Sequence, residues 1–173
     1  IANIGKEFSY NSLKKAFKFG SVNSVISFVS FFEDSYMLFT VPKFAYSYKK
    51  QIINKKKVYS IDNGFSNANS VSFSKDLGKM LENIVFITLR RKHKNIFYFQ
   101  ETGECDLIIK ERGQISQAIQ ICYSLTNQNK DREINGLLEA LNEFKLSQGL
   151  ILTYNQDDEF KIRVHLTMKS LIS

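Results

Sequence analysis

The stretch of residues 102–123 constrains the fold most strongly, because it holds two β-type apolar runs joined by a short polar linker. The first run covers residues 107–109 and the second covers residues 118–123. Gly113 lies in the linker, and a glycine between two such runs is typical of a β-hairpin. We therefore predict two neighbouring antiparallel strands here.

Polar side chains recur at alternate positions along this predicted hairpin. Glu104 and Asp106 are two residues apart where the first strand begins, and Gln120 and Cys122 have the same spacing on the second strand. Alternate residues of a strand point to the same side. Each pair is therefore expected on one side of its strand, opposite to the apolar residues between them.

This pattern resembles the core of the PD-(D/E)XK nuclease-like fold, in which an Asp opens one strand and a Glu-x-Lys pair follows on the next. In such a site carboxylates hold Mg²⁺, the metal activates water, and the Lys adds positive charge near the phosphate. Asp106 matches the Asp, but the Glu-x-Lys pair is replaced by Gln120-x-Cys122. Gln offers a neutral oxygen, whereas Cys is a poor Mg²⁺ ligand and carries no positive charge. The resemblance thus predicts the fold and argues against the activity.

The formal net charge of +7 lies entirely in the first third of the chain. Residues 1–57 contain ten lysines and three acidic residues, whereas residues 58–173 contain equal numbers of basic and acidic residues. Such an asymmetry indicates two modules, of which the basic one can meet a polyanion. A solvated surface is the alternative explanation. We divide the chain accordingly into a basic module (1–57) and a second domain (58–173).

The basic module has the outline of a winged helix. Apolar spacing predicts helices over residues 11–18 and 21–34, with Ser21 as the N-cap of the second helix. Strands are predicted at residues 36–41 and 57–61. The exposed positions of the second helix hold no Arg or Lys, so this helix is poorly suited to reading bases in a DNA groove.

Lysines concentrate in the connection between these two predicted strands, with Tyr46 and Tyr48 among them. As a wing, this connection would contact phosphates of DNA. The alternative is a solubilising loop. The candidate nucleic-acid-binding residues are Lys43, Lys49, Lys50, Lys55, Lys56 and Lys57.

Residues 58–173 are expected to form an α/β (α+β) domain, a restriction-endonuclease-like mixed sheet flanked by helices. The 58–64 segment is interpreted as a strand that runs into an Asn-Gly turn. Further helices are predicted at residues 75–92, 131–145 and 167–172, and further strands at residues 96–99, 149–154 and 162–166.

Glu82 lies on the predicted helix 75–92 in mostly apolar company. In the nuclease-like fold the first core helix often offers one Glu to the site, and Glu82 would take that position. The alternative is a glutamate at the rim of the helix, whose carboxylate reaches water.

The two cysteines and the lack of long apolar runs indicate the cellular environment of the chain. Cys105 and Cys122 both lie in predicted strands, which indicates small buried thiols and a reduced, cytoplasmic environment. No apolar run approaches 18 residues, so we expect neither a membrane span nor a membrane partner. The chain begins at Ile1 without a signal-peptide pattern, and the absence of Met there suggests a fragment.

Segments along nearly the whole chain resemble the C-terminal region of a family of prokaryotic AAA-type ATPases. In that family a nucleotide-binding domain precedes a winged helix and a nuclease-like domain. The resemblance implies a residual site at Glu82, Asp106 and Gln120, with Mg²⁺ held by Asp106 and Glu82. No G-x-x-x-x-G-K-[ST] motif is present, so ATP would bind only in a part of the protein that this chain lacks. The matching segments are VYSIDNG (58–64), GKMLENIVFITLRR (78–91), GECDLI (103–108), AIQICYS (118–124), Asp131-Arg132-Glu133 and GLILTY (149–154).

Three functions are open on this basis. The first is a non-catalytic domain of an ATPase that binds nucleic acid or a protein partner, and the one-sided positive charge and the missing Glu-x-Lys pair favour it. The second is a Mg²⁺-dependent nuclease with a variant site. The third is a structural module through which the ATPase associates with itself or with another protein.

Overall fold

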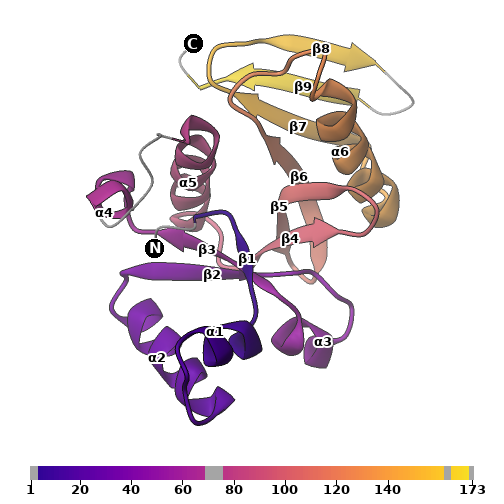
Figure 1. Ribbon diagram of the computed structural model, residues 1–173. Coiled ribbons are helices and arrows are strands. Elements are labelled where there is room, and N and C mark those ends of the chain that lie inside the picture. Colours follow the sequence, from indigo (N-terminus) through magenta and orange to yellow (C-terminus); the bar gives the residue numbers. More distant parts are fainter. Residues whose placement is uncertain (1–3, 69–75, 162–164, 172–173) are drawn as a thin grey trace. The chain divides into compact units, whose positions relative to one another are not determined.

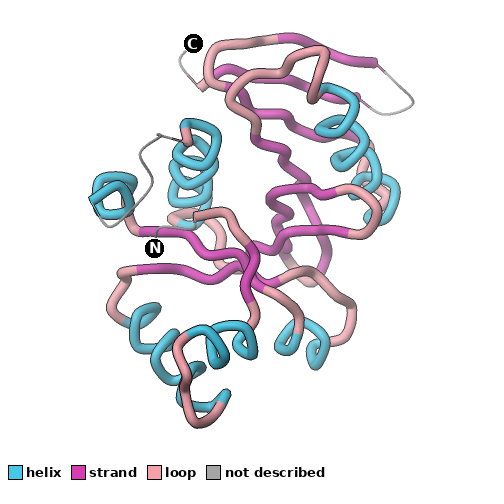
Figure 2. The backbone as a smooth tube through the Cα atoms, in the orientation of Figure 1, coloured by secondary structure: helices cyan, strands magenta, loops and turns pink. Residues whose placement is uncertain are grey.

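The structure belongs to the mixed α/β class, with one small antiparallel sheet and one larger mixed sheet (Figure 1, Figure 2). Helices flank the sheets, as the sequence predicts. Among the described residues, none of the helices combines the length and hydrophobicity that crossing a membrane requires. The computed structural model describes residues 4–68, 76–161 and 165–171.

The chain divides into two compact units, Ile1–Ile87 and Thr88–Ser173. The predicted boundary at residue 57 differs from this division because it falls inside strand β3 (Lys56–Ser60). β3 is the middle strand of the small sheet, so backbone hydrogen bonds hold it to the strands that precede it in the sequence. The division falls inside helix α5 (Leu77–Arg90), whose residues up to Ile87 belong to the first unit.

A three-stranded antiparallel sheet in the order β1-β3-β2 forms the centre of the first unit. The other elements of this unit are β1 (Glu7–Phe8), α1 (Tyr10–Ala16), α2 (Val22–Asp34), β2 (Leu38–Pro42), α3 (Tyr48–Ile53) and α4 (Asn63–Ala68). Helices α1 and α2 lie on one side of the sheet, and α4 and the part of α5 up to Ile87 lie on the other (Figure 1).

The side chains of β3 alternate between these two sides, because successive residues of a strand point to opposite faces. Val58 packs against the buried residues of α2 and β2. Tyr59 points the other way, is fully buried and stacks on Phe86 of α5, with 4.2 Å between the ring centroids. Asn83 of α5 accepts a hydrogen bond from the Ser60 N–H (2.9 Å) and donates one to the Ser60 carbonyl (3.1 Å). Its amide therefore pairs with the end of β3 as another strand would, and fixes α5 on the sheet.

Serine side chains start both helices before β2. Ser21 caps α2 by accepting a hydrogen bond from the Ser24 N–H, as predicted. Ser9 and Ser12 form a reciprocal capping box at the start of α1. These bonds satisfy N–H groups that have no partner within the helix. Both predicted helices are thus confirmed.

A six-stranded mixed sheet in the order β4-β5-β6-β7-β9-β8 forms the second unit. Its elements are β4 (Ile96–Gln100), β5 (Glu104–Glu111), β6 (Gln114–Ile121), α6 (Lys130–Phe144), β7 (Gln148–Thr153), β8 (Asp158–Lys161) and β9 (His165–Ser170). β6 and β7 are parallel, so their connection must cross the sheet, and α6 makes this crossing while packing on β5, β6 and β7.

The predicted hairpin is confirmed in β5 and β6, which pair antiparallel. Only two residues join them, Arg112 and Gly113, with φ angles of +50° and +86°. Positive φ at both positions is the type I′ combination, whose twist matches that of the flanking strands. The strands therefore extend further into the polar linker than the apolar runs alone suggest (Figure 2).

Helix α6 comes unusually close to β5 at Gly136. A Cβ at this position would collide with the carbonyl oxygen of Glu104. One turn later, the Glu139 carboxylate accepts hydrogen bonds from the N–H groups of Thr102 (3.1 Å) and Gly103 (2.5 Å). The bond from Gly103 is the main reason why the pKa of Glu139 lies below its usual value. The helix is thus fixed to the turn between β4 and β5.

Three segments take a structure other than the predicted one, and strands β1 and β8 lie where none is predicted. Residues 48–53, expected in a wing or loop, form helix α3. Asn63 and Gly64, expected in a turn, begin helix α4, where Asp62 accepts a hydrogen bond from the Phe65 N–H. Most of the last predicted helix is strand β9, because it pairs in parallel with β7 and gains ladder hydrogen bonds. Predicted positions outside the described residues are Ser74 and Lys75 at a helix start, residues 162–164 of a strand and Ile172.

We expect the substitution Gly136→Ala to destabilise the second unit by about 1–3 kcal/mol, because the new Cβ must displace backbone atoms of β5. The helix itself would gain from alanine by roughly 0.5–1 kcal/mol, so the close approach reverses the usual sign. Urea unfolding followed by circular dichroism measures the effect.

Gly78→Ala provides the control, because a Cβ at Gly78 of α5 would meet its nearest atom at an ordinary 3.4 Å. This variant should be neutral or slightly stabilised. A Gly136→Ala protein as stable as the parent would contradict the packing of α6 on β5.

Candidate functional site

Asp106 and Gln120 face each other on strands β5 and β6, under helix α6. Asp106 Oδ2 accepts a hydrogen bond from the Ile121 N–H at 3.0 Å, and Gln120 Oε1 accepts one from the Asp106 N–H at 3.3 Å. Both side chains are buried. The structure thus brings together the two hairpin residues that the sequence assigns to the site.

A third polar residue, Glu133 of helix α6, completes this cluster. Gln120 Nε2 donates a hydrogen bond to Glu133 Oε2 at 2.6 Å. The other carboxylate oxygen of Glu133 accepts hydrogen bonds from the guanidinium of Arg132, which is exposed. The bond to Glu133 raises the pKa of Arg132, and the charges of Asp106 and Glu104 raise it further. Arg132 therefore pairs with Glu133 and lies close enough to Asp106 and Glu104 to be affected by their charges.

The Cys122 thiol lies beside this cluster and is buried. Burial raises its pKa to about 12, with contributions from the negative charges of Glu133 and Asp106. Thiolate is the nucleophilic form of cysteine, so a thiol with this pKa is inert near neutral pH. Cys122 and Cys105 are both free and buried, as the sequence predicts.

The cluster does not fit a Mg²⁺ ion. Mg²⁺ takes oxygen ligands in near-octahedral geometry, whereas here an N–H group of Gln120 points at Glu133 and a backbone N–H points at Asp106. A guanidinium already balances the charge of Glu133. Within the described parts of the chain, no three His, Cys, Asp or Glu side chains are grouped so that they can hold a metal ion.

Glu82, the third predicted site residue, belongs to the first unit and has partners there. Its Oε1 accepts a hydrogen bond from the Tyr59 hydroxyl at 2.7 Å and lies 3.5 Å from the Lys57 ammonium. A Cβ at Gly5 would lie 2.6 Å from Glu82 Oε2, so the backbone of Gly5 closes over the carboxylate. Within this unit, Glu82 therefore joins α5 to β3.

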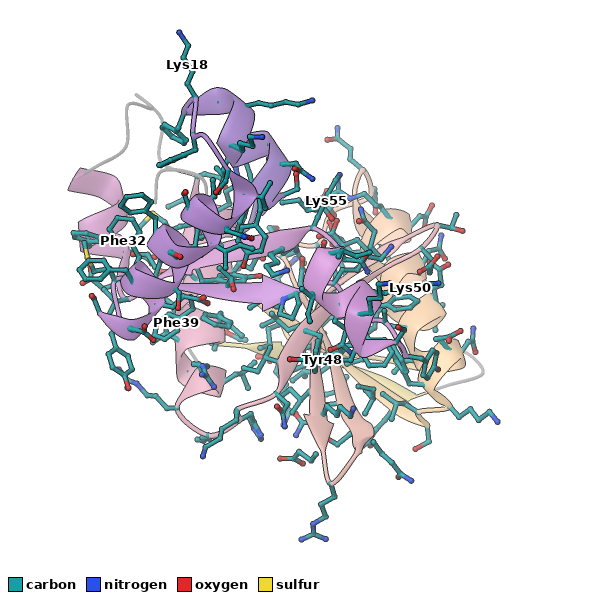
Figure 3. All side chains as sticks on the ribbon, turned by 90° about the horizontal axis from the view of Figure 1, so that it is seen from below. Lys18, Phe32, Phe39, Tyr48, Lys50 and Lys55 are labelled. Atoms are coloured by element: carbon teal, nitrogen blue, oxygen red, sulfur yellow. The ribbon has the colours of Figure 1, made fainter. Side chains whose placement is uncertain are left out.

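The six candidate lysines fall into two groups. Lys49, Lys50 and Lys55 are exposed, and Lys43 is half-buried. Figure 3 labels Lys50 on helix α3 and Lys55 in the segment that follows this helix. Lys55 forms an ion pair with Glu7 at 2.9 Å. The remaining two, Lys56 and Lys57, are 8% and 2% exposed and lie within β3.

Buried Lys56 holds helix α3 in place. Its ammonium donates to the carbonyl oxygens of Gln51 (3.4 Å), Ile52 (2.7 Å) and Asn54 (3.4 Å) at the end of that helix. It also lies 5.0 Å from the centroid of the Tyr10 ring. Burial lowers the pKa of Lys56, and the charge of Glu33 acts in the opposite direction. Lys56 therefore replaces the missing partners of the last carbonyls of a short helix.

Sequence reasoning missed Glu133 and Arg132 as members of the cluster. Both occur in the Asp131-Arg132-Glu133 segment, where acidic residues in the first turn of α6 are explained by the helix dipole alone. The informative signal is the position of Glu133 one turn before Gly136, which brings this part of the helix against the sheet.

We expect neither cysteine of the folded protein to react with Ellman's reagent at pH 8, because the raised pKa and the burial of Cys122 suppress its thiolate. Absorbance at 412 nm should rise only when guanidinium chloride unfolds the protein, and then by two thiols per chain. Rapid reaction of Cys122 in the folded protein would show that the cluster is open to solvent.

Comparisons with known proteins find similarity to a family model and to a relative whose functions are not known. Residues 1–76 match a domain of unknown function (DUF8612). The chain is 36% identical over 171 residues to an uncharacterized protein, MJ1544, of Methanocaldococcus jannaschii. That alignment covers 95% of this chain and 36% of the relative, so the chain spans little more than a third of its length. No solved structure matches the chain.

Proposed function

We propose that this chain is a non-catalytic module that binds DNA and forms the degenerate nuclease-like end of an AAA-type ATPase. The observation that carries the proposal is the exposed positive charge of Lys49 and Lys50 in a segment, residues 43–57, that holds no acidic residue. Phosphate contacts by such lysines supply affinity without reading sequence.

Two features support the resemblance on which the ATPase part of the proposal rests. In the first unit, a helix pair precedes the β2–β3 strand pair, which is the winged-helix outline. In the second unit, Asp106 and Gln120 lie opposite each other at the positions of the nuclease pattern. Helix α3 lies in the connection between β2 and β3, where a winged helix is expected to have a wing, so the first unit departs from the outline at this point.

The hydrogen bonds of the carboxylate cluster argue against cleavage. Metal-assisted hydrolysis needs carboxylate oxygens that are open to a cation and a water molecule. Gln120 instead joins Asp106 and Glu133 through its neutral amide, and Arg132 pairs with Glu133. Cys122, at the position of the catalytic Lys, is buried and carries no charge near neutral pH.

We expect fluorescence anisotropy to detect salt-sensitive binding of the protein to DNA. The double variant Lys49→Ala/Lys50→Ala should weaken binding and reduce the slope of log K against log salt by about 2, since each phosphate contact contributes roughly 0.9. Lys92→Ala/Lys94→Ala removes the same charge from exposed positions of the second unit and should leave the slope nearly unchanged. If both double variants lost the same affinity, net charge alone would explain the binding. Affinity that does not respond to salt would contradict the proposal.

A second candidate function is a Mg²⁺-dependent nuclease with a variant site. It is favoured by Glu133, whose carboxylate is bonded to Gln120. This carboxylate adds an acid to the cluster, in which the Glu of the Glu-x-Lys pair is missing. Rearrangement of Gln120 would be required before a cation could enter.

Plasmid nicking in Mg²⁺ or Mn²⁺ separates the two candidates. We expect no nicking by the parent protein or by Asp106→Ala, because the oxygens of the cluster accept hydrogen bonds from the protein itself. Nicking by the parent that Asp106→Ala abolishes would establish the nuclease and remove the non-catalytic proposal.

A third candidate, association with a protein, is favoured by the exposed phenylalanines of helix α2. Phe28 and Phe31 are both more than half exposed, and Phe17 lies before the start of this helix with its ring also exposed. Exposed apolar surface of this kind often marks protein contacts. Analytical ultracentrifugation would detect self-association through it.

A further inference from the structure

Two tyrosines on or next to helix α3 expose their rings to an unusual degree. Tyr46 and Tyr48 are 77% and 76% exposed, although tyrosine normally covers much of its ring with other residues. Figure 3 shows Tyr48 and Lys50 on α3, and Lys49 next to them in sequence is also exposed. Aromatic rings and ammonium groups are thus presented together to solvent.

Side-chain hydrogen bonds join this short helix to residues before its start and after its end. At its end, the Lys56 ammonium binds three carbonyl oxygens, and Gln51 within the helix donates from Nε2 to the carbonyl of Ala45, which precedes the helix, at 2.5 Å. The ring of Phe44 meets that of Tyr46 edge to face, with 5.3 Å between the centroids. A helix of six residues is unstable by itself, so these contacts keep its exposed rings in place. Binding to such a preorganised surface costs little ordering entropy.

We propose that Tyr46 and Tyr48 stack on the bases of single-stranded DNA while Lys49 and Lys50 contact its phosphates, an assignment that rests on the proposed function. Flat aromatic rings beside lysines are the equipment with which proteins bind single strands, since every unpaired base presents a face for stacking. In a duplex these faces are covered by neighbouring bases, so exposed tyrosines would contribute nothing there.

Other surfaces of the first unit favour a single strand over a duplex. Helix α2, the counterpart of a recognition helix, carries no Lys or Arg and ends in Glu33 and Asp34. It is therefore unsuited to a DNA groove that is lined by phosphates. In the segment of residues 43–57, by contrast, no acidic side chain opposes the approach of a phosphate backbone.

Fluorescence anisotropy with labelled oligothymidylate and a blunt-ended duplex of equal length tests the assignment. We expect the parent to bind oligothymidylate more tightly than the duplex. Tyr48→Ala should weaken oligothymidylate binding about tenfold and leave duplex binding unchanged, whereas Tyr48→Phe, which keeps the ring, should bind like the parent. Tyr36→Ala is the matched control, because Tyr36 is another strongly exposed tyrosine of this unit.

The possible failures are distinguishable. If the parent binds neither DNA, the proposed function falls and this inference with it. If it binds both equally well and Tyr48→Ala changes nothing, DNA binding stands and the stacking surface is refuted. An oligouridylate of equal length that bound tenfold more tightly than oligothymidylate would overturn the assignment to DNA. Circular dichroism of each variant confirms that the fold is retained.

Discussion

The approach of helix α6 to strand β5 at Gly136 is the contact on which the second unit depends most directly. Because no side chain separates the two backbones there, the helix lies close enough for side chains one turn away to reach the sheet. On one side Glu133 reaches Gln120, and on the other Glu139 reaches the N–H of Gly103. One missing side chain therefore sets the geometry of both the polar cluster and the turn between β4 and β5.

Charged residues that resemble a catalytic or binding set serve to join elements within each unit. Glu82 accepts a hydrogen bond from Tyr59 and so connects α5 with β3, while Lys56 connects β3 with α3. In the sequence such residues look the same as functional ones, because the chemistry of the side chain is the same. Their partners distinguish them: a charge that is already balanced inside a unit is not offered to a ligand. The exposed charges of Lys49 and Lys50 differ in this respect.

Local signals in the sequence predict helices, strands and turns. They do not predict contacts between segments that are far apart in the sequence. Gly113 predicts the hairpin and Ser21 predicts the start of α2, because a turn and a cap are determined by adjacent residues. Helix α3 is too short to leave a periodic pattern and depends on Lys56, which follows it in another element. Likewise, Glu133 meets Gln120 only after α6 has folded across the sheet, so the residues next to Glu133 in the sequence do not reveal its partner.

The position of β3 in its sheet bears on how such a protein can change in evolution. β3 is the central strand, and Asn83 of α5 supplies hydrogen bonds to the backbone of Ser60 at its end. A gene fusion that joined new sequence directly after β3 would remove those partners and would uncover the ring of Tyr59, which α5 now covers through Phe86. Recombination would therefore preserve the fold only if its breakpoint lay after Phe86. The segment that recombination can transfer intact therefore includes most of helix α5, whereas the distribution of charge along the chain indicates a segment that ends at residue 57.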